Sequence, residues 1–414
     1  MAPVDDISSD TRVTKTRLLA GISANVLVLG IVSLLTDLSS EMIYSVLPLF
    51  LVSLGATGLV IGLIEGAAEA TASFLKVFSG WYSDRVNRRK PFIQLGYGLS
   101  SFVKPLLVLA TAPWHVFGIR ISERVGKGIR SAPRDALIAD STDESVRGLA
   151  YGFHKAMDSA GAVLGPIAAI AVLALVASME QLDQYRVIFL LATIPAFAAV
   201  FVIFAFVREK EGAGKRPRGT FAKESRNLGR PFFTLLAIVA IISIGEVSSL
   251  WFILRGKDSG LSDVHVIGLY TLYNIIFVVT AIPSGSISDR AGRKPVIAAS
   301  FAVVVATYAL MALDGPLILL ASGFVLLGVY KGASEGVLKA YVVDVVPDHL
   351  RGTALGTFHT AVGMAALPGS IIAGLLWDYV GHWATFAYGA AAAVFGLVLL
   401  LTFGPAGRNG VTPA

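Results

Sequence analysis

Long apolar segments separated by short polar turns dominate the 414-residue sequence and constrain its fold more than any other feature. A helix that crosses a hydrocarbon layer of about 30 Å needs about 20 mostly apolar residues, because its backbone polar groups find no partner in lipid. This length predicts an all-α membrane protein with twelve transmembrane helices. We expect them near residues 25–54, 59–82, 91–111, 115–140, 148–176, 185–207, 231–255, 263–288, 295–313, 317–345, 352–378 and 383–404.

The composition excludes several classes of protein and site. The chain is 55% hydrophobic and 15% charged, whereas about a quarter of the residues in a soluble domain are charged. It has no cysteine, which excludes disulfides, thiolate metal ligands and cysteine nucleophiles. The polar first residues lack the apolar core of a secretory signal, so we expect the N-terminus to be retained.

Lysine and arginine are concentrated in alternate loops, and this pattern predicts the orientation of the chain. Clusters of cations occur at residues 85–90, 208–230 and 290–294, whereas few lie in the loops on the other side. Because positively charged loops stay on the cytoplasmic side, both termini are predicted to be cytoplasmic. We expect a multi-pass protein of the bacterial inner (cytoplasmic) membrane.

One long polar break divides the sequence into halves. The segment REKEGAGKRPRGTFAKESRNLGR at 208–230 is rich in glycine and in both signs of charge, which is typical of a flexible linker. We therefore expect an N-terminal six-helix bundle at 1–207, a cytoplasmic linker at 208–230 and a C-terminal six-helix bundle at 231–414.

A shift of about 205 residues brings the two halves into register, which indicates an internal repeat. GWYSDRVNRRKP at 80–91 matches GSISDRAGRKP at 285–295, and Asp140 matches Asp344. Two parallel repeats of six helices form pseudo-symmetric bundles with a solute site between them, near the middle of the membrane. The repeat therefore predicts a carrier that works by alternating access.

Two copies of a loop signature, Gly-x-x-x-Asp-Arg-x-Gly-Arg-Lys/Arg, make the whole chain resemble the major facilitator superfamily. The matching residues are Gly80, Asp84, Arg85, Arg88 and Arg89 in the first copy and Gly285, Asp289, Arg290, Gly292, Arg293 and Lys294 in the second. The first copy has Asn87 at the glycine position, and asparagine also tolerates a left-handed turn. The resemblance implies that the aspartate braces the two bundles, with Asp84 near the N-terminal end of the helix that begins near Arg351. The alternative is that the cations only orient the chain.

The predicted fifth helix carries glycines whose spacing is similar to the antiporter signature of drug/proton exchangers in this superfamily. Gly152, Gly161, Gly165 and Pro166 match the signature, although the chain lacks its final glycine pair. Glycines on one helix face allow a close helix contact, and ordinary small-residue packing is the alternative interpretation. The resemblance favours exchange of a solute for protons over co-transport.

Acidic residues within the predicted spans are candidates for proton coupling. Such acids are costly in lipid, so they usually face a cavity and have a function. The candidates form two pairs spaced four residues apart and one single acid: Asp37 with Glu41, Glu65 with Glu69, and Glu246. Two carboxylates so close are not easily ionised together, so one of each pair can bind and release a proton. The alternative is a structural ion pair, such as Glu69 with Lys76.

The predicted fourth helix carries charges at steps of three or four residues, which place them on one face. With Trp114 at the interface, the membrane centre lies near Gly126, whereas Arg134 reaches the headgroups. Cations at the centre predict an anionic or zwitterionic solute. The substrate-cavity candidates, including two residues of the tenth helix, are Arg120, Glu123, Arg124, Lys127, Lys331 and Glu335.

The sequence thus predicts a secondary active transporter that exports a small amphipathic or anionic organic molecule by proton antiport. A proton-coupled symporter that imports an organic anion is the alternative, and a membrane-embedded enzyme or a non-transporting receptor of the same fold is a more distant one. The sequence has no phosphate-binding glycine loop, metal-ligand cluster or nucleophilic triad, so no cofactor, metal or catalytic residue is expected. The expected partners of a monomer are solute, protons and membrane lipid, and not nucleic acid.

Overall fold

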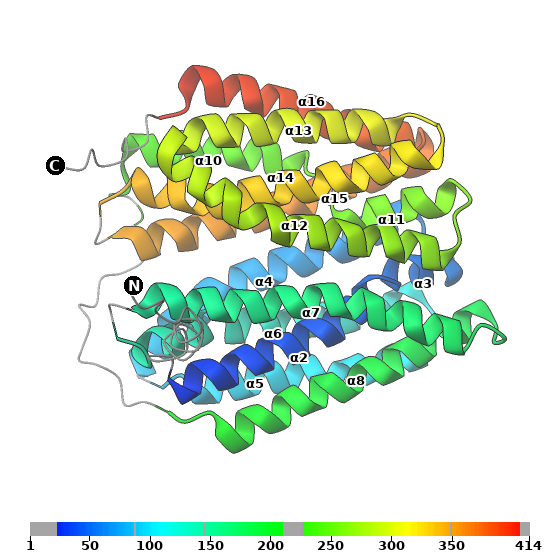
Figure 1. Ribbon diagram of the computed structural model, residues 1–414, viewed down its shortest axis with the longest axis horizontal. Helices are drawn as coiled ribbons and strands as arrows, with labels where there is room; N and C mark the ends of the chain where they lie inside the picture. Colours follow the sequence, from blue (N-terminus) through cyan, green and yellow to red (C-terminus); the bar gives the residue numbers. More distant parts are fainter. Residues whose placement is uncertain are drawn as a thin grey trace, which may run out of the picture.

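The chain folds into long helices that run side by side (Figure 1). The computed structural model describes residues 23–86, 88–143, 146–209, 225, 227–347 and 350–405, without the side chain of Asp84. No strand occurs within these ranges, which confirms the all-α fold class for the described chain. The helices, with one short 3₁₀ helix η1, are α2 (Ala24–Tyr44), α3 (Leu47–Ser53), α4 (Gly58–Val86), α5 (Lys90–Val103), η1 (Lys104–Leu109), α6 (Pro113–Asp140), α7 (Arg147–Leu175), α8 (Gln181–Phe206), α10 (Gly229–Ile244), α11 (Ser249–Asp258), α12 (Asp263–Ala291), α13 (Arg293–Ala312), α14 (Leu317–Asp344), α15 (Arg351–Tyr379) and α16 (His382–Phe403).

Eleven helical segments of the described chain are long and apolar enough to cross a membrane. Two of them combine consecutive helices across a break, α2 with α3 and α10 with α11, and a third continues α5 into η1. Helix α6 is not among the eleven because charged side chains interrupt its apolar sequence. It nevertheless runs for 28 residues and packs against α4 and α5. Its charges therefore need partners within the protein.

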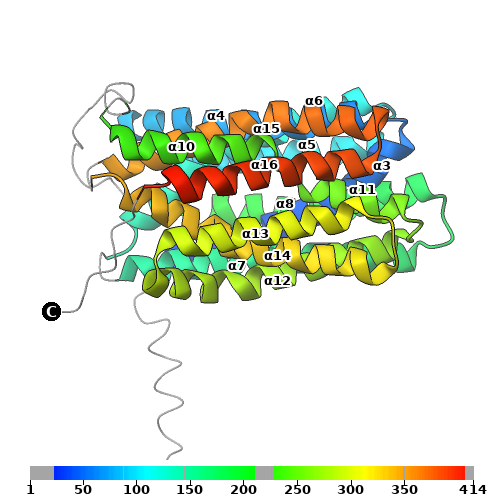
Figure 2. The same cartoon turned by 90° about the horizontal axis from the view of Figure 1, so that it is seen from above.

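The helices form two bundles that lie against each other (Figure 1), and the bundles overlap when the molecule is seen from above (Figure 2). In the N-terminal bundle, α2 packs against α7 and α8, and α6 packs against α4 and α5. In the C-terminal bundle, α14 packs against α12 and α13, and α16 packs against α10, α13 and α15. The main contacts between the bundles are α4 with α15, α7 with α12, and α3 with α11. Most of the predicted linker, residues 210–224 and 226, lies outside the described residues.

The two ends of the molecule carry different segments. Helix α2 begins and α16 ends at one end, here called the terminal end (Figure 1). The opposite, distal end carries the start of α4 at Gly58 and the end of α15 at Tyr379. Glycine lets these two helices touch, because a Cβ at Gly62 would lie 2.1 Å from the carbonyl oxygen of Ser370. The two bundles therefore meet backbone to backbone along α4 and α15.

The first predicted helix, 25–54, is interrupted in the structure. Helix α2 ends at Tyr44 and α3 begins at Leu47. Pro48 explains the break, because it has no N–H group to donate to the carbonyl of Tyr44. The apolar segment is thus continuous in sequence but bends in space.

The predicted helix at 231–255 is also interrupted, between Ile244 and Ser249. Side chains satisfy the freed backbone groups: Val247 N donates to Tyr308 Oη at 3.0 Å, and Tyr388 Oη donates to the Ile244 carbonyl at 2.8 Å. Non-helical backbone at membrane depth needs such partners. As a result, Glu246 lies in a non-helical segment between α10 and α11.

The internal repeat appears again in the contacts of the two loop signatures at the terminal end. Arg89 lies 3.6 Å from Asp140, and Arg293 lies 3.1 Å from Asp344. Each arginine also donates to a serine of the preceding helix. In the aligned signatures Arg88 corresponds to Arg293. The arginine that contacts the aspartate in the first copy, Arg89, therefore lies one position after the one that does so in the second copy. The two halves therefore share a contact as well as a sequence pattern.

The other signature residues lie mostly on the surface of the terminal end. A Cβ at Gly80 would lie 3.1 Å from Ala132 Cβ of α6, whereas nothing lies within 4 Å of the position a Cβ would occupy at Gly285. Gly292 has a φ of +92°, the left-handed conformation that the tight loop between α12 and α13 requires. Asn87 and the side chain of Asp84 lie outside the described residues, so the expected brace at Asp84 stays a prediction. The exposed charged residues of the signatures are Arg85, Arg88, Asp289 and Arg290.

Candidate functional site

Ionisable side chains from both bundles converge on the region where the bundles meet. They come from α2, α4, α6 and α7 on one side and from α14 and the break between α10 and α11 on the other. Interior charges are costly unless they are paired or serve a function. The way in which each charge is paired therefore separates structural groups from candidate functional groups.

Asp37 on α2 and Asp158 on α7 form a carboxyl pair. Their carboxyl groups lie close enough to share a hydrogen bond. Asp158 also accepts hydrogen bonds from Ser33 at 3.0 Å and from Lys155 at 2.7 Å. Two carboxyl groups can hydrogen-bond to each other only when one of them carries a proton. The Asp37–Asp158 pair is therefore a site that can hold and release a proton.

Asp158 is not among the residues predicted from the sequence. Its spacing from Lys155 indicates only a local ion pair on one helix. The expected sharing of a proton between Asp37 and Glu41 stays a prediction, and the structure adds a contact of Asp37 with Asp158 across two helices. A polar residue on the glycine-rich face of α7 is the one signal in the sequence that points to this role.

The glycines of the antiporter-like signature bring α7 onto the acidic face of α2. A Cβ at Gly161 would lie 3.0 Å from Asp37 Cβ, and a Cβ at Gly165 would lie 2.6 Å from Glu41 Cβ. The close helix contact predicted for these two positions is present. For Gly152 the prediction is wrong, because nothing lies within 4 Å of the position its Cβ would occupy. Pro166 is buried within α7 and does not end the helix.

The two acids of α4 are paired with arginines of α6. Arg120 lies 3.5 Å from Glu65 and 2.6 Å from Glu123. Arg124 lies 2.8 Å from Glu69. The structure thus favours the ion-pair alternative for Glu65 and Glu69, with arginines of another helix as partners. These pairs satisfy most of the charge that α6 brings into the bundle.

The cations of α6 nearer the terminal end are also satisfied. Arg130 donates to Ser100 at 2.8 Å, and its guanidinium lies 4.1 Å from the centre of the Tyr97 ring. Arg134 pairs with Asp135 at 2.9 Å. Both arginines have a structural explanation, so we leave them out of the candidate site.

Lys127 differs from the arginines of α6. Its side chain is exposed, and within the described chain no carboxylate oxygen lies within 4.0 Å of its Nζ. Asp37 and Glu69 lie within electrostatic range but do not contact it. Lys127 is therefore a cation at the site that is free to bind a negatively charged group.

Glu41 lies beside the same site and has a neutral partner. Its carboxylate accepts a hydrogen bond from Tyr270 of α12 at 2.7 Å, which links the two bundles. The ring of Tyr270 lies 6.0 Å from that of Tyr44 and 5.5 Å from that of Tyr273. The partner of Glu41 thus belongs to a cluster of three tyrosine rings that come from both bundles.

The candidate site residues of the C-terminal bundle form ion pairs with other residues of that bundle. Lys331 of α14 forms an ion pair with Glu246 in the break between α10 and α11. Glu335 pairs with Lys339 at 2.9 Å. Together with the pairs of α6, these contacts leave the candidate site much less cationic than the sequence pattern indicates. The reason is that nearly every candidate cation has an acid of a neighbouring turn or helix beside it.

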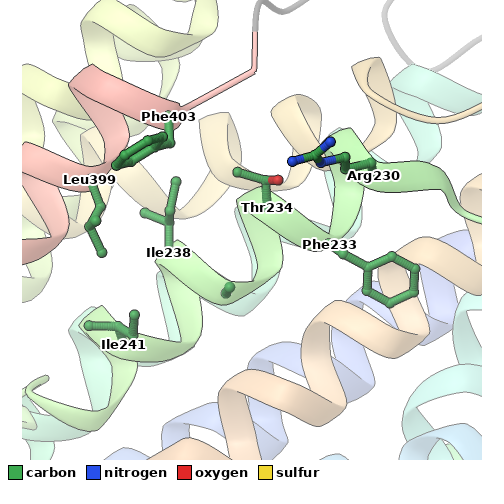
Figure 3. Close-up of a pocket in the computed structure, with 8 residues that line it drawn as sticks. Arg230, Phe233, Thr234, Ile238, Ile241, Leu399 and Phe403 are labelled. Atoms are coloured by element: carbon green, nitrogen blue, oxygen red, sulfur yellow. The ribbon is translucent and has the colours of Figure 1, made fainter.

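A surface groove between α10 and α16 is separate from this site (Figure 3). The groove has a volume of about 400 Å³. It contains none of the predicted site residues, so we do not assign the solute to it. It is lined by Arg230, Phe233, Thr234, Ala237, Ile238, Ile241, Leu399 and Phe403.

Comparison with known proteins identifies the family. The model of the Major Facilitator Superfamily matches residues 29–267 and 236–413. The chain belongs to the major facilitator superfamily. An uncharacterized MFS-type transporter of Methanocaldococcus jannaschii is 37% identical over 389 residues, which cover 92% of this chain and 95% of that protein. A class C tetracycline resistance protein of Escherichia coli is 35% identical over 133 residues, 32% of this chain and 33% of that protein.

Solved structures of the superfamily share the fold. A mutant form of the nucleoside transporter NupG has a TM-score of 0.77 at 13% identity, with 91% of this chain and 98% of that chain covered. A D-xylose-proton symporter has a TM-score of 0.74 at 16% identity, with 94% and 99% covered. This major facilitator protein is therefore an integral, multi-pass membrane protein whose family and fold are those of transporters and not of enzymes.

Proposed function

We propose that this major facilitator protein is a proton-coupled secondary transporter that works by alternating access, with the Asp37–Asp158 pair as its proton site. We assign twelve membrane crossings, α6 included, in the inner (cytoplasmic) membrane. Both termini are cytoplasmic in this proposal, because the cation-rich turns lie at the terminal end. The solute is a small amphipathic organic molecule with at least one negatively charged group, and it is exported in exchange for protons.

The observation that carries this proposal is the close approach of the carboxyl groups of Asp37 and Asp158, where α7 packs onto α2 at Gly161. Lys127 lies within electrostatic range of Asp37, so the charge of the pair and a charge bound at Lys127 influence each other. Two ligands whose binding free energies are linked can drive each other's movement in a carrier with two accessible states. The pair and Lys127 supply that link.

Export is supported by the local similarity to a tetracycline resistance protein. A transporter confers resistance when it carries the compound out of the cell. The glycine contact of α7 with α2 lies beside the proposed proton site, at the positions of the antiporter-like signature. These two observations favour exchange.

One observation favours import of an organic anion together with protons as a second candidate. A negative group at Lys127 leaves the proton of the Asp37–Asp158 pair in place, so anion and proton bind together. The sign of the proton flux separates the two functions. In proteoliposomes with an internal pH dye, solute uptake is accompanied by acidification of the lumen in symport and by alkalinisation in exchange.

The test of the proton site compares Asp37→Asn and Asp158→Asn with the matched control Asp183→Asn. Asp183 forms an exposed pair with Arg186 within α8. We expect both site variants to lose flux driven by a pH gradient, to keep counterflow of labelled solute, and to lose the infrared band of a protonated carboxyl group. The control should retain all three properties. Gradient-driven flux in both site variants would disprove the assignment.

A further inference from the structure

Two side chains of opposite charge at the site lack ionic partners. Within the described residues, no carboxylate oxygen lies within 4.0 Å of Lys127 Nζ, and no cationic nitrogen lies within 4.0 Å of the Glu41 carboxylate. The two residues do lie within electrostatic range of each other. They come from α6 and α2, two helices of the N-terminal bundle. A cation and an anion that both lack an ionic partner therefore belong to the same part of the N-terminal bundle.

These two charges contrast with their neighbours. Glu65 and Glu69 have arginine partners, and Lys331 has Glu246. A charge without an ionic partner within a membrane protein usually faces a cavity and has a function. The Lys127 side chain is exposed and that of Glu41 is partly exposed, so a ligand can reach both charges and pair them. A purely anionic ligand would pair Lys127 and place a second negative charge beside the α2 carboxylate.

The hydrogen-bonding capacity of Glu41 is only partly used. Tyr270 donates to one of its oxygens, Oε2, and a carboxylate accepts at both oxygens. The other oxygen is therefore available to an ammonium group. The nearby aromatic ring of Tyr270 also favours a positive charge over its face.

We propose that this site binds a zwitterion of the α-amino acid type, with its ammonium group on Glu41 and its carboxylate on Lys127. The side chain of the solute packs against the aromatic rings of Tyr44, Tyr270 and Tyr273. This inference rests on the proposed transport function and specifies the chemical class of its solute.

The zwitterion also accounts for exchange. Glu41 lies one helical turn from Asp37, so an ammonium group at Glu41 places a positive charge near the Asp37–Asp158 pair. The positive charge of the ammonium group weakens binding of the proton at the pair by repulsion. Binding of the solute and binding of the proton therefore disfavour each other. A simple anion at Lys127 would not produce this competition.

Binding of matched compounds to the purified full-length protein tests the inference without any gradient. Three sets each contain an amino acid, the same molecule without its ammonium group, and the same molecule without its carboxylate. They are leucine, isocaproate and isopentylamine; phenylalanine, phenylpropionate and phenethylamine; and tryptophan, indolepropionate and tryptamine. Because a lost charged hydrogen bond weakens binding about tenfold or more, the amino acid of at least one set should bind at least about tenfold more tightly than both analogues.

Variants assign the two ends of the ligand. Glu41→Gln should weaken binding of the amino acid and the amine about tenfold, and leave the carboxylate analogue unchanged. Lys127→Gln should weaken binding of the amino acid and the carboxylate analogue, and leave the amine unchanged. Lys127→Arg, which keeps the positive charge, should restore binding. Glu180→Gln is the matched control, since Glu180 is exposed at the start of α8. If Glu41→Gln does not fold, the ranking of the analogues by the unmodified protein and by the Lys127 variants is the test.

The inference is overturned if in every set the carboxylate analogue binds as tightly as the amino acid, or if Glu41→Gln weakens the carboxylate analogue as much as the amino acid. Failure of the transport proposal looks different. In that case the binding ranking holds in detergent, and proteoliposomes show no movement of the bound amino acid under a pH gradient.

Discussion

The carboxylate of Asp378, near the end of α15, accepts a hydrogen bond from the backbone N–H of Gly58, the first residue of α4, at 2.6 Å. Its second oxygen accepts from the N–H of Leu59 at 2.8 Å. The first N–H groups of a helix have no partner within the helix and carry partial positive charge, so an aspartate there is stabilising. Because α15 and α4 belong to different bundles, this cap fastens the bundles together at the distal end.

Removal of this cap should favour states in which the distal end is open. Asp378→Asn removes the charge, which costs about 1 kcal/mol and changes the ratio of the two states about fivefold. The chain has no cysteine, so spin labels can be attached at Met179→Cys and Leu313→Cys, two exposed distal positions in different bundles. Electron paramagnetic resonance should show a larger population at the longer distance.

The control for this measurement is Asp183→Asn. Asp183 also lies near the distal end, but its partner Arg186 is on the same helix. An exposed pair of this kind contributes little to stability, so the distance distribution should not change. Equal distributions for Asp378→Asn and the unmodified protein would show that the cap does not hold the distal end closed.

The positions of the helices could be predicted from the sequence because lipid imposes a length and a composition on them. The predicted helix at 263–288 corresponds to α12 at Asp263–Ala291, and that at 352–378 corresponds to α15 at Arg351–Tyr379. The breaks could not be predicted in the same way, since the polar residues Glu246 and Ser248 do not by themselves end a helix. What permits the second break is a pair of tyrosine hydroxyls from other helices.

The site could be predicted only in part. The acids and cations were identifiable because each is unusual within an apolar segment. Their partners depend on how the helices are rotated and how closely they approach, and a single sequence does not contain that information. Asp158 illustrates the limit, since its contact with Asp37 arises from a glycine contact between α7 and α2.

The glycine contact that positions the proton site can be tested with single methyl groups. Gly165→Ala places a Cβ 2.6 Å from Glu41 Cβ, so α7 must move away from α2 at a cost of about 1 to 3 kcal/mol. Gly152→Ala is the matched control on the same helix, because nothing lies near its Cβ. Thermal unfolding in detergent should show a lower apparent melting temperature for Gly165→Ala. The melting temperature of Gly152→Ala should not fall. Equal melting temperatures would contradict the close contact.

The ion pair between Arg124 and Glu69 should couple the stabilities of α6 and α4. Arg124→Gln leaves the Glu69 carboxylate without its partner, and we expect a loss of about 1 to 3 kcal/mol. The loss is smaller than for a fully buried pair, because the side chain of Glu69 is 39% exposed. The double variant, Arg124→Gln with Glu69→Gln, should recover part of the loss.

A double-mutant cycle on urea or thermal unfolding measures this coupling. The exposed pair of Arg186 with Asp183 provides the reference, for which a coupling energy of about 0 to 1 kcal/mol is expected. Strict additivity of the two changes at Arg124 and Glu69 would mean that the pair makes no net contribution to stability.

The break between α10 and α11 should depend on Tyr308. Tyr308→Phe removes the oxygen that accepts a hydrogen bond from Val247 N at 3.0 Å, and it leaves this buried N–H group unsatisfied at a cost of about 1 to 3 kcal/mol. The apparent melting temperature should fall, whereas Tyr379→Phe, at a side chain that is 81% exposed, should not change it. The break also positions Glu246 for its ion pair with Lys331. Transport of any solute found for the protein should therefore be slower in Tyr308→Phe. An unchanged melting temperature would indicate that the residues of the break find another partner, such as a return to continuous helix.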